Sequence, residues 1–118
     1  FVSYCAFMTR KSGRFQEDPH GVMKKFIAQF ERGHILLRPQ HEFITDRQGN
    51  LMVDYVGKFE SFEFHFEVIC QRIGFSDLET SKVNESKHKP YKHYFTPQLK
   101  DAVYNLYKKD VALFGYEF

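Results

Sequence analysis

The sequence predicts an α/β protein that is mostly helical, with one short region of strand and hairpin. Apolar residues recur at helical spacing in four segments, and one run between them carries apolar residues on both alternating faces. Hydrophobic residues make up 42% of the 118 residues, which is too apolar for disorder and enough for a modest core. The chain therefore forms a single domain or part of one.

The helices are bounded by residues that favour helix starts and stops. An Asp or Thr followed by Pro caps a helix and places the Pro where its missing N–H costs nothing, and Gly favours the C-terminal stop. The expected helices cover residues 1–8, then run from Asp18-Pro19 to Gly33, from Ser61 to Gly74, and from Thr96-Pro97 past Leu113.

The extended region lies between the second and third of these helices. Residues 46–50 read Asp-Arg-Gln-Gly-Asn, a loop composition typical of a hairpin, and they separate the apolar segments 43–45 and 51–57. Because residues 51–57 are apolar on both faces, they are expected to form a strand covered from both sides.

Asp110 interrupts the apolar stripe of the last helix. It follows Leu99 by eleven positions, about three helical turns, so a continuous helix returns it to the apolar face. A buried carboxylate needs a partner, because leaving it unpaired is costly. We expect a structural bond to a Lys, an Arg or a backbone N–H; a catalytic acid is the alternative.

Composition excludes several classes of function. The net charge of +2 does not indicate a nucleic-acid or membrane partner, and no apolar run approaches the ~20 residues of a membrane span. Cys5 and Cys70 are too few for a disulfide framework and are expected to be buried, inert thiols. The histidines form no HxH or HExxH motif, so we expect no bound metal.

A basic cluster precedes the last helix and is the strongest candidate for ligand binding. Cationic or titratable side chains interleaved with aromatic ones suit a phosphate or a nucleotide base, whereas a solvated loop is the alternative. The cluster consists of Lys82, Lys87, His88, Lys89, Lys92 and His93, with Tyr91 and Tyr94.

Several short motifs, taken in order, resemble those of carbohydrate sulfotransferases of the Golgi type and their bacterial relatives. They are His34-x5-Gln40 with Pro39-Gln40, the sequence VDYVGKFE at 53–60, Asn84-x-Ser86, Tyr94-Phe95-Thr96, and Tyr107-x2-Asp110-x3-Phe114-x-Tyr116. The resemblance covers most of residues 1–118 and implies the C-terminal part of a single sulfotransferase domain. The implied fold is P-loop-kinase-like, a parallel sheet flanked by helices.

The resemblance also implies a donor and a place for it. The donor substrate would be 3′-phosphoadenosine-5′-phosphosulfate, with no metal. Ser3, in Phe-Val-Ser-Tyr, matches the serine of the family's 3′-phosphate motif. The loop carrying Lys87 and His88 matches, by position and basic character, the loop that closes over that phosphate. The 5′-phosphosulfate loop and the catalytic base would lie upstream, so no residue here is assigned as catalytic.

The acceptor implied by the resemblance is a carbohydrate hydroxyl. Arg38, Gln40 and His41 follow the family's Pro-Gln element and could face an acidic sugar, or Gln40 could instead satisfy buried backbone. The compartment would be the cytoplasm for a bacterial source and the Golgi lumen for a eukaryotic one. Without the upstream part, the chain would be inactive, and apolar surface left by missing strands would favour self-association. The alternative function is a non-catalytic module that binds a phosphate, a nucleotide or another protein through the basic cluster.

Overall fold

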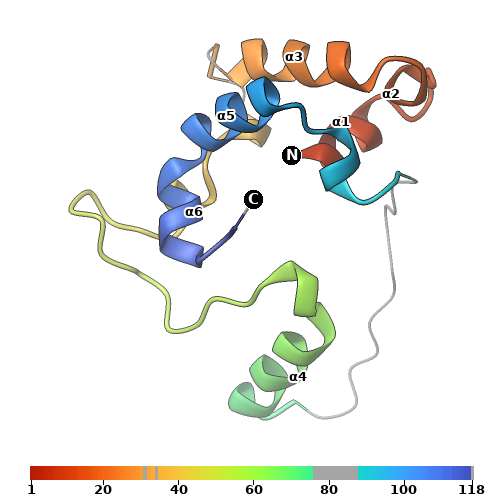
Figure 1. Cartoon of the computed structure of the whole chain (residues 1–118). Coiled ribbons are helices and arrows are strands. Elements are labelled where there is room, and N and C mark those ends of the chain that lie inside the picture. The colour runs from red at the N-terminus through yellow and green to blue at the C-terminus, as the bar shows by residue number, and fades with distance from the viewer. Residues whose placement is uncertain (31, 34, 76–87, 118) are drawn as a thin grey trace. The chain divides into compact units, whose positions relative to one another are not determined.

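The computed structural model describes residues 1–30, 32–33, 35–75 and 88–117. The chain divides into two compact units, one formed by Phe1–Ile44 with Asn84–Phe118 and the other by Thr45–Val83. Regular structure in the described residues is helical, which confirms the mostly helical prediction (Figure 1). The α-helices are α1 (Val2–Met8), α2 (Arg14–Glu17), α3 (Pro19–Phe30), α4 (Phe62–Ile73), α5 (Pro97–Leu106) and α6 (Lys108–Phe114), and the 3₁₀-helices are η1 (Ile35–Leu37), η2 (Gln40–Phe43), η3 (Phe59–Ser61) and η4 (Tyr91–Tyr94).

The core of the first unit joins the N-terminal helices to α5. In Figure 1, α3 lies alongside α5, and η4 lies next to α1. Phe15 of α2 and Met23 of α3 are almost completely enclosed. The buried cluster consists of Val2, Cys5, Ala6, Phe15, Val22, Met23, Phe26, Leu37 and Leu99. Segments far apart in sequence therefore share one core, although α2 was not expected from the sequence.

The helix boundaries follow the local signals. Asp18 Oδ1 accepts a hydrogen bond from the Gly21 amide at 2.8 Å, and Thr96 Oγ1 accepts one from the Leu99 amide at 3.3 Å. Gly33 and Gly74 follow α3 and α4 with φ of 76° each, a left-handed conformation that glycine adopts without a steric penalty. Both predicted N-caps and both predicted stops are confirmed.

The last helix differs from the prediction because it is divided. It breaks at Tyr107, whose φ of −111° and ψ of 22° are not helical, giving α5 and α6 in place of one helix. The phenolic O–H of Tyr107 donates a hydrogen bond to the carbonyl oxygen of Leu37 at 2.8 Å. Burial raises the pKa of Tyr107, so the hydroxyl remains a neutral donor.

The second unit contains the predicted loop. Asp46 Oδ1 accepts hydrogen bonds from the amides of Gln48 and Asn50, and the Asp46 amide donates to the Asn50 carbonyl. The Asn50 side-chain amide also donates to Asp46 Oδ2 at 3.0 Å, and this bond, followed by the backbone amide bonds to the carboxylate, holds the pKa of Asp46 below its usual range. The loop closes on one antiparallel bridge between Thr45 and Leu51.

The predicted strand over residues 51–57 is wrong for the described chain. Beyond the bridge at Leu51 the backbone forms bends and coil, and Met52, Val53 and Val56 are exposed. The described residues contain no strand, so the α/β class is not observed there. A strand that is apolar on both faces needs neighbouring strands to pair with and layers that cover each face. A single bridge supplies neither.

Cys5 is expected to be chemically inert in the folded chain. It is free and fully buried, and burial raises its pKa to about 12. Because the folded pKa is raised, burying the neutral Cys5 thiol stabilises the fold fully at a pH below the pKa of the unfolded thiol. This contribution is lost as the pH rises toward the folded pKa. In a Cys70→Ser variant, a disulfide reagent at pH 8 should react with Cys5 only after urea unfolds the chain. Rapid native reaction, comparable to free cysteine, would contradict this burial.

Candidate functional site

The candidate donor side begins on α1. Val2, Cys5 and Ala6 point into the core, whereas Ser3 lies on the exposed part of the same helix. Because three neighbouring residues are buried, the backbone that carries Ser3 is held in place by packing. Ser3 therefore lies at the surface of the first unit, on a helix that the core holds.

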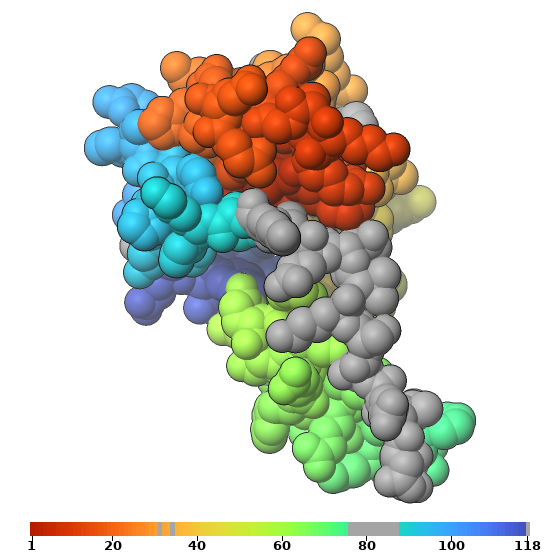
Figure 2. Space-filling view, turned by 90° about the vertical axis from the view of Figure 1, so that its right-hand side faces the viewer, coloured from red at the N-terminus to blue at the C-terminus, as the bar shows by residue number. Residues whose placement is uncertain are grey.

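The described end of the basic cluster packs against the same helices. η4 contacts α1, and Figure 2 shows the teal segment that contains η4 lying against the red N-terminal helices. Tyr94 anchors it: its ring centroid is 4.9 Å from that of Phe15, and its hydroxyl accepts a hydrogen bond from the Lys89 amide at 2.9 Å. The structure therefore brings the helix of Ser3 and the end of the predicted phosphate loop into one unit.

His88 is the described member of the predicted donor pair. Its ring lies edge-on to Tyr94 with a centroid separation of 6.4 Å. Its Nδ1 is 2.7 Å from the Lys89 carbonyl oxygen, and since a carbonyl can only accept, Nδ1 must carry the proton. Lys87 and Lys82 lie outside the described residues.

The candidate acceptor segment is fixed by Asp110. Asp110 Oδ2 accepts a hydrogen bond from the Gln40 amide at 2.6 Å, and Oδ1 accepts one from the His41 amide at 2.9 Å. The His41 Nδ1 lies 2.6 Å from Asp110 Oδ1, and the Asp110 side chain is 9% exposed. The carboxylate of α6 thus caps the start of η2, which confirms the predicted structural bond to backbone N–H groups.

Tyr107 supports the same segment from one turn earlier. Its bond to the Leu37 carbonyl fixes the chain immediately before Arg38 and Pro39. The Phe30 ring packs edge-on against Tyr107 with centroids 5.5 Å apart. Sequence reasoning named Tyr107 as part of a motif but gave it no role; its position three residues before Asp110 was the available signal.

Arg38 is already engaged with a neighbouring carboxylate. Its guanidinium nitrogen Nη2 lies 2.7 Å from Glu42 Oε2, and it also lies over the Phe43 ring at 5.2 Å. The two side chains of the ion pair are 44% and 38% exposed, so the pair contributes little free energy. An anionic ligand could therefore replace Glu42 as the partner of Arg38 at small cost.

Neither a metal-binding cluster nor a membrane-spanning helix occurs in the described part of the chain. No group of three or more His, Cys, Asp or Glu side chains there could hold a metal ion. In the same residues, none of the helices combines the length and apolar character that crossing a bilayer requires.

Comparison with known proteins identifies the family. Residues 10–117 match the model of the sulfotransferase family. The chain belongs to the sulfotransferase family. No curated protein and no solved structure matches it. The matched range of this sulfotransferase-family chain includes the Asp110-anchored segment and the Tyr94 anchor, whereas Ser3 precedes it.

Family membership supports sulfuryl transfer as the general activity. The described candidate residues fall in two regions, one with Ser3 and His88 and the other an ordered segment with Arg38. Both belong to the first unit, which makes them parts of one compact body.

Proposed function

We propose that this chain serves a sulfotransferase that moves a sulfuryl group from 3′-phosphoadenosine-5′-phosphosulfate to a carbohydrate hydroxyl. The general activity follows from the family, and the donor and acceptor are our extension of it. The observation that carries the proposal is the packing of η4, at the end of the basic cluster, against the helix that bears Ser3.

On the donor side, we assign Ser3, Lys87 and His88 to the 3′-phosphate of the nucleotide. A serine hydroxyl can donate one hydrogen bond to a phosphate oxygen, and basic side chains offset the phosphate charge. Tyr94 supports this assignment because it fixes the backbone of Lys89, next to His88, against the core.

On the acceptor side, we assign Arg38, Gln40 and His41 to the carbohydrate. Asp110 and Tyr107 hold this segment through backbone bonds, so its side chains would meet the acceptor on a pre-ordered support. Arg38 would exchange its exposed contact with Glu42 for a carboxylate or sulfate on the sugar.

The proposed reaction is an in-line transfer in a domain of the P-loop-kinase type. The acceptor hydroxyl gives its proton to a base and attacks sulfur. The new oxygen–sulfur bond forms as the bond from sulfur to the phosphate oxygen breaks, and adenosine 3′,5′-bisphosphate leaves. Holding both partners in line lowers the barrier mainly through orientation and stabilisation of the leaving phosphate. We assign no residue of this chain as the base, so its role is to bind and orient.

Replacing Ser3 with Ala in the full-length protein should weaken the binding of adenosine 3′,5′-bisphosphate. Losing one hydrogen bond to a charged group costs about 1.5–3 kcal/mol, which corresponds to a dissociation constant roughly 10- to 150-fold higher. Isothermal calorimetry measures this change directly.

Two controls isolate the 3′-phosphate. Ser12→Ala removes another exposed serine, whose hydroxyl bonds the Thr9 carbonyl, and should leave affinity unchanged. Adenosine 5′-phosphate lacks the 3′-phosphate and should bind the wild type and Ser3→Ala equally. An equal loss for both nucleotides, or no loss at all, would exclude Ser3 from the 3′-phosphate site.

A further inference from the structure

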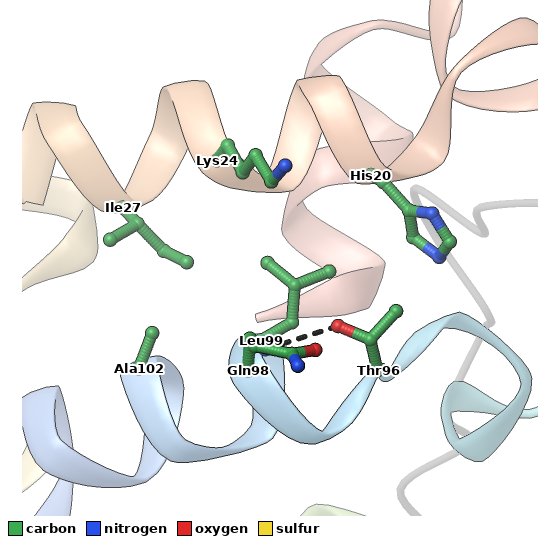
Figure 3. Close-up of a pocket in the computed structure, with 7 residues that line it drawn as sticks. All are labelled: His20, Lys24, Ile27, Thr96, Gln98, Leu99 and Ala102. Atoms are coloured by element: carbon green, nitrogen blue, oxygen red, sulfur yellow. Dashed lines mark hydrogen bonds between the residues drawn. The ribbon is translucent and has the colours of Figure 1, made fainter.

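A concave site lies between α3 and α5, apart from the residues assigned to donor and acceptor. It is an open cavity of ≈ 420 Å³, within the size range of small-molecule pockets. Figure 3 shows His20 and Ile27 extending from α3 toward α5, with Leu99 extending back toward α3. The residues that line it are His20, Lys24, Ile27, Thr96, Gln98, Leu99 and Ala102.

The α3 wall of this cavity carries the Lys24 ammonium and the His20 imidazole, and no carboxylate lines it. His20 and Lys24 are one helical turn apart and lie on the same side of α3. Within the described chain, neither side chain has a hydrogen bond or ion pair. The lining contains no Asp or Glu, and the nearby Asp18 instead accepts a hydrogen bond from the Gly21 amide.

The α5 wall supplies neutral hydrogen-bond donors. Thr96 Oγ1 accepts from the Leu99 amide, so its own O–H proton remains to be donated. Gln98 contributes two amide N–H donors to the same wall. Gln98 also has a carbonyl acceptor, but the Lys24 ammonium on the α3 wall adds only donors and a positive charge, so the lining favours an oxyanion over a cation.

The floor of the cavity is apolar. Ile27, Leu99 and Ala102 line it, with Leu99 near the middle and Ile27 and Ala102 facing each other (Figure 3), and Leu99 is only 3% exposed. An inorganic ion would leave this apolar surface exposed to water. A ligand with an attached ring would cover it and gain about 25 cal/mol of binding free energy per Å² of apolar surface buried. The combination of charged wall and apolar floor selects the chemical class of the ligand.

We propose that the cavity between α3 and α5 binds a small organic anion, a carboxylate, phosphate or sulfate joined to an apolar ring. The oxyanion lies between Lys24 and the Thr96 and Gln98 donors, and the ring covers Ile27 and Ala102. This site goes beyond the proposed transfer reaction, because none of the residues assigned to the donor or the acceptor lines it.

The test is a titration of the 118-residue chain with benzoate and with phenyl phosphate, followed by amide chemical shifts. We expect saturable shifts at α3 and α5 with a Kd of about 1 mM or lower, and much weaker binding of benzyl alcohol and inorganic phosphate. Equal binding of benzyl alcohol, equal binding of inorganic phosphate, or no saturation would each overturn the proposal.

Adjacent lysines provide matched variants. Lys24→Gln should raise the Kd of phenyl phosphate about fivefold or more, whereas Lys25→Gln, at an exposed position outside the cavity, should leave it unchanged. Ala102→Leu keeps all charges and should abolish binding by filling the floor. Circular dichroism confirms folding of each variant. Equal losses in both lysine variants would mean diffuse surface charge and would sink the assigned site.

This titration uses no nucleotide and measures no sulfuryl transfer, so it is independent of the proposed function. A failure here leaves the Ser3 experiment untouched, and failure of that experiment leaves this cavity untouched.

Discussion

Replacing Asp110 with Ala is expected to lower the free energy of unfolding by about 3–5 kcal/mol. The substitution removes the acceptor of the Gln40 amide, the His41 amide and the His41 ring nitrogen together. Asp110 is 6% exposed, so water cannot readily replace it. Urea unfolding followed by circular dichroism measures the loss.

A local measurement separates this role from general destabilisation. In Asp110→Ala, hydrogen exchange at the Gln40 and His41 amides should accelerate through local opening, without global unfolding. The Met23 amide lies in the core, so its exchange rate should change only as much as the free energy of global unfolding changes. Asp110→Asn keeps the shape and one acceptor oxygen, so its cost should be smaller.

The matched control is Asp101, an exposed aspartate on α5. Asp101→Ala should change the free energy of unfolding by no more than about 0.5 kcal/mol, as is usual for surface positions. If Asp110→Ala behaves like Asp101→Ala, the hydrogen bonds of Asp110 contribute nothing net, and the segment at Gln40 must be held in another way.

Asp110 also shows how far the sequence can predict the site. A carboxylate in an apolar stripe had to be bound, and that much followed from the cost of burying a charge. Its partners could not be derived, because Gln40 and His41 lie 70 and 69 positions away. The local sequence predicted that the Asp110 carboxylate needs a hydrogen-bond partner, whereas the identity of that partner depends on the tertiary structure.

The helix boundaries were predictable for the same local reason. Asp18 and Thr96 bond amides three residues later, and Gly33 and Gly74 adopt a positive φ, so each signal acts within one turn of chain. The break at Tyr107 was not predictable, since the apolar stripe continues through it and the hydrogen bond to Leu37 spans 70 positions. Tertiary contacts override local propensity there.

The strand over 51–57 failed because strand formation depends on pairing. Its hairpin loop at Asp46 was predicted correctly from composition, since its hydrogen bonds join residues within four positions. Alternating apolar residues indicate which faces a strand would bury, but they do not provide the neighbouring strands.

The candidate site residues came from a resemblance, and their roles stay predictions. These residues are Ser3, Lys87, His88, Arg38, Gln40 and His41.

Replacing Phe15 with Ala should have a comparable effect through the core, lowering the free energy of unfolding by about 3–5 kcal/mol. Phe15 is 1% exposed, and no neighbouring backbone can collapse fully into the space of a phenyl ring. Since small domains are stable by only about 5–15 kcal/mol, the variant would populate the unfolded state measurably. Thermal and urea unfolding both report it.

Phe15→Ala should also loosen the candidate donor side before the chain unfolds. Tyr94 packs on Phe15 and holds the Lys89 amide, so losing the ring removes one support of the segment next to His88. Hydrogen exchange at the Lys89 amide should therefore accelerate below the unfolding transition. Phe59→Ala, at a phenylalanine that is 84% exposed, should change neither stability nor this exchange rate. Unchanged Lys89 exchange in a folded Phe15→Ala variant would mean that Tyr94 is held independently of the core, and the link between packing and the phosphate loop would be lost.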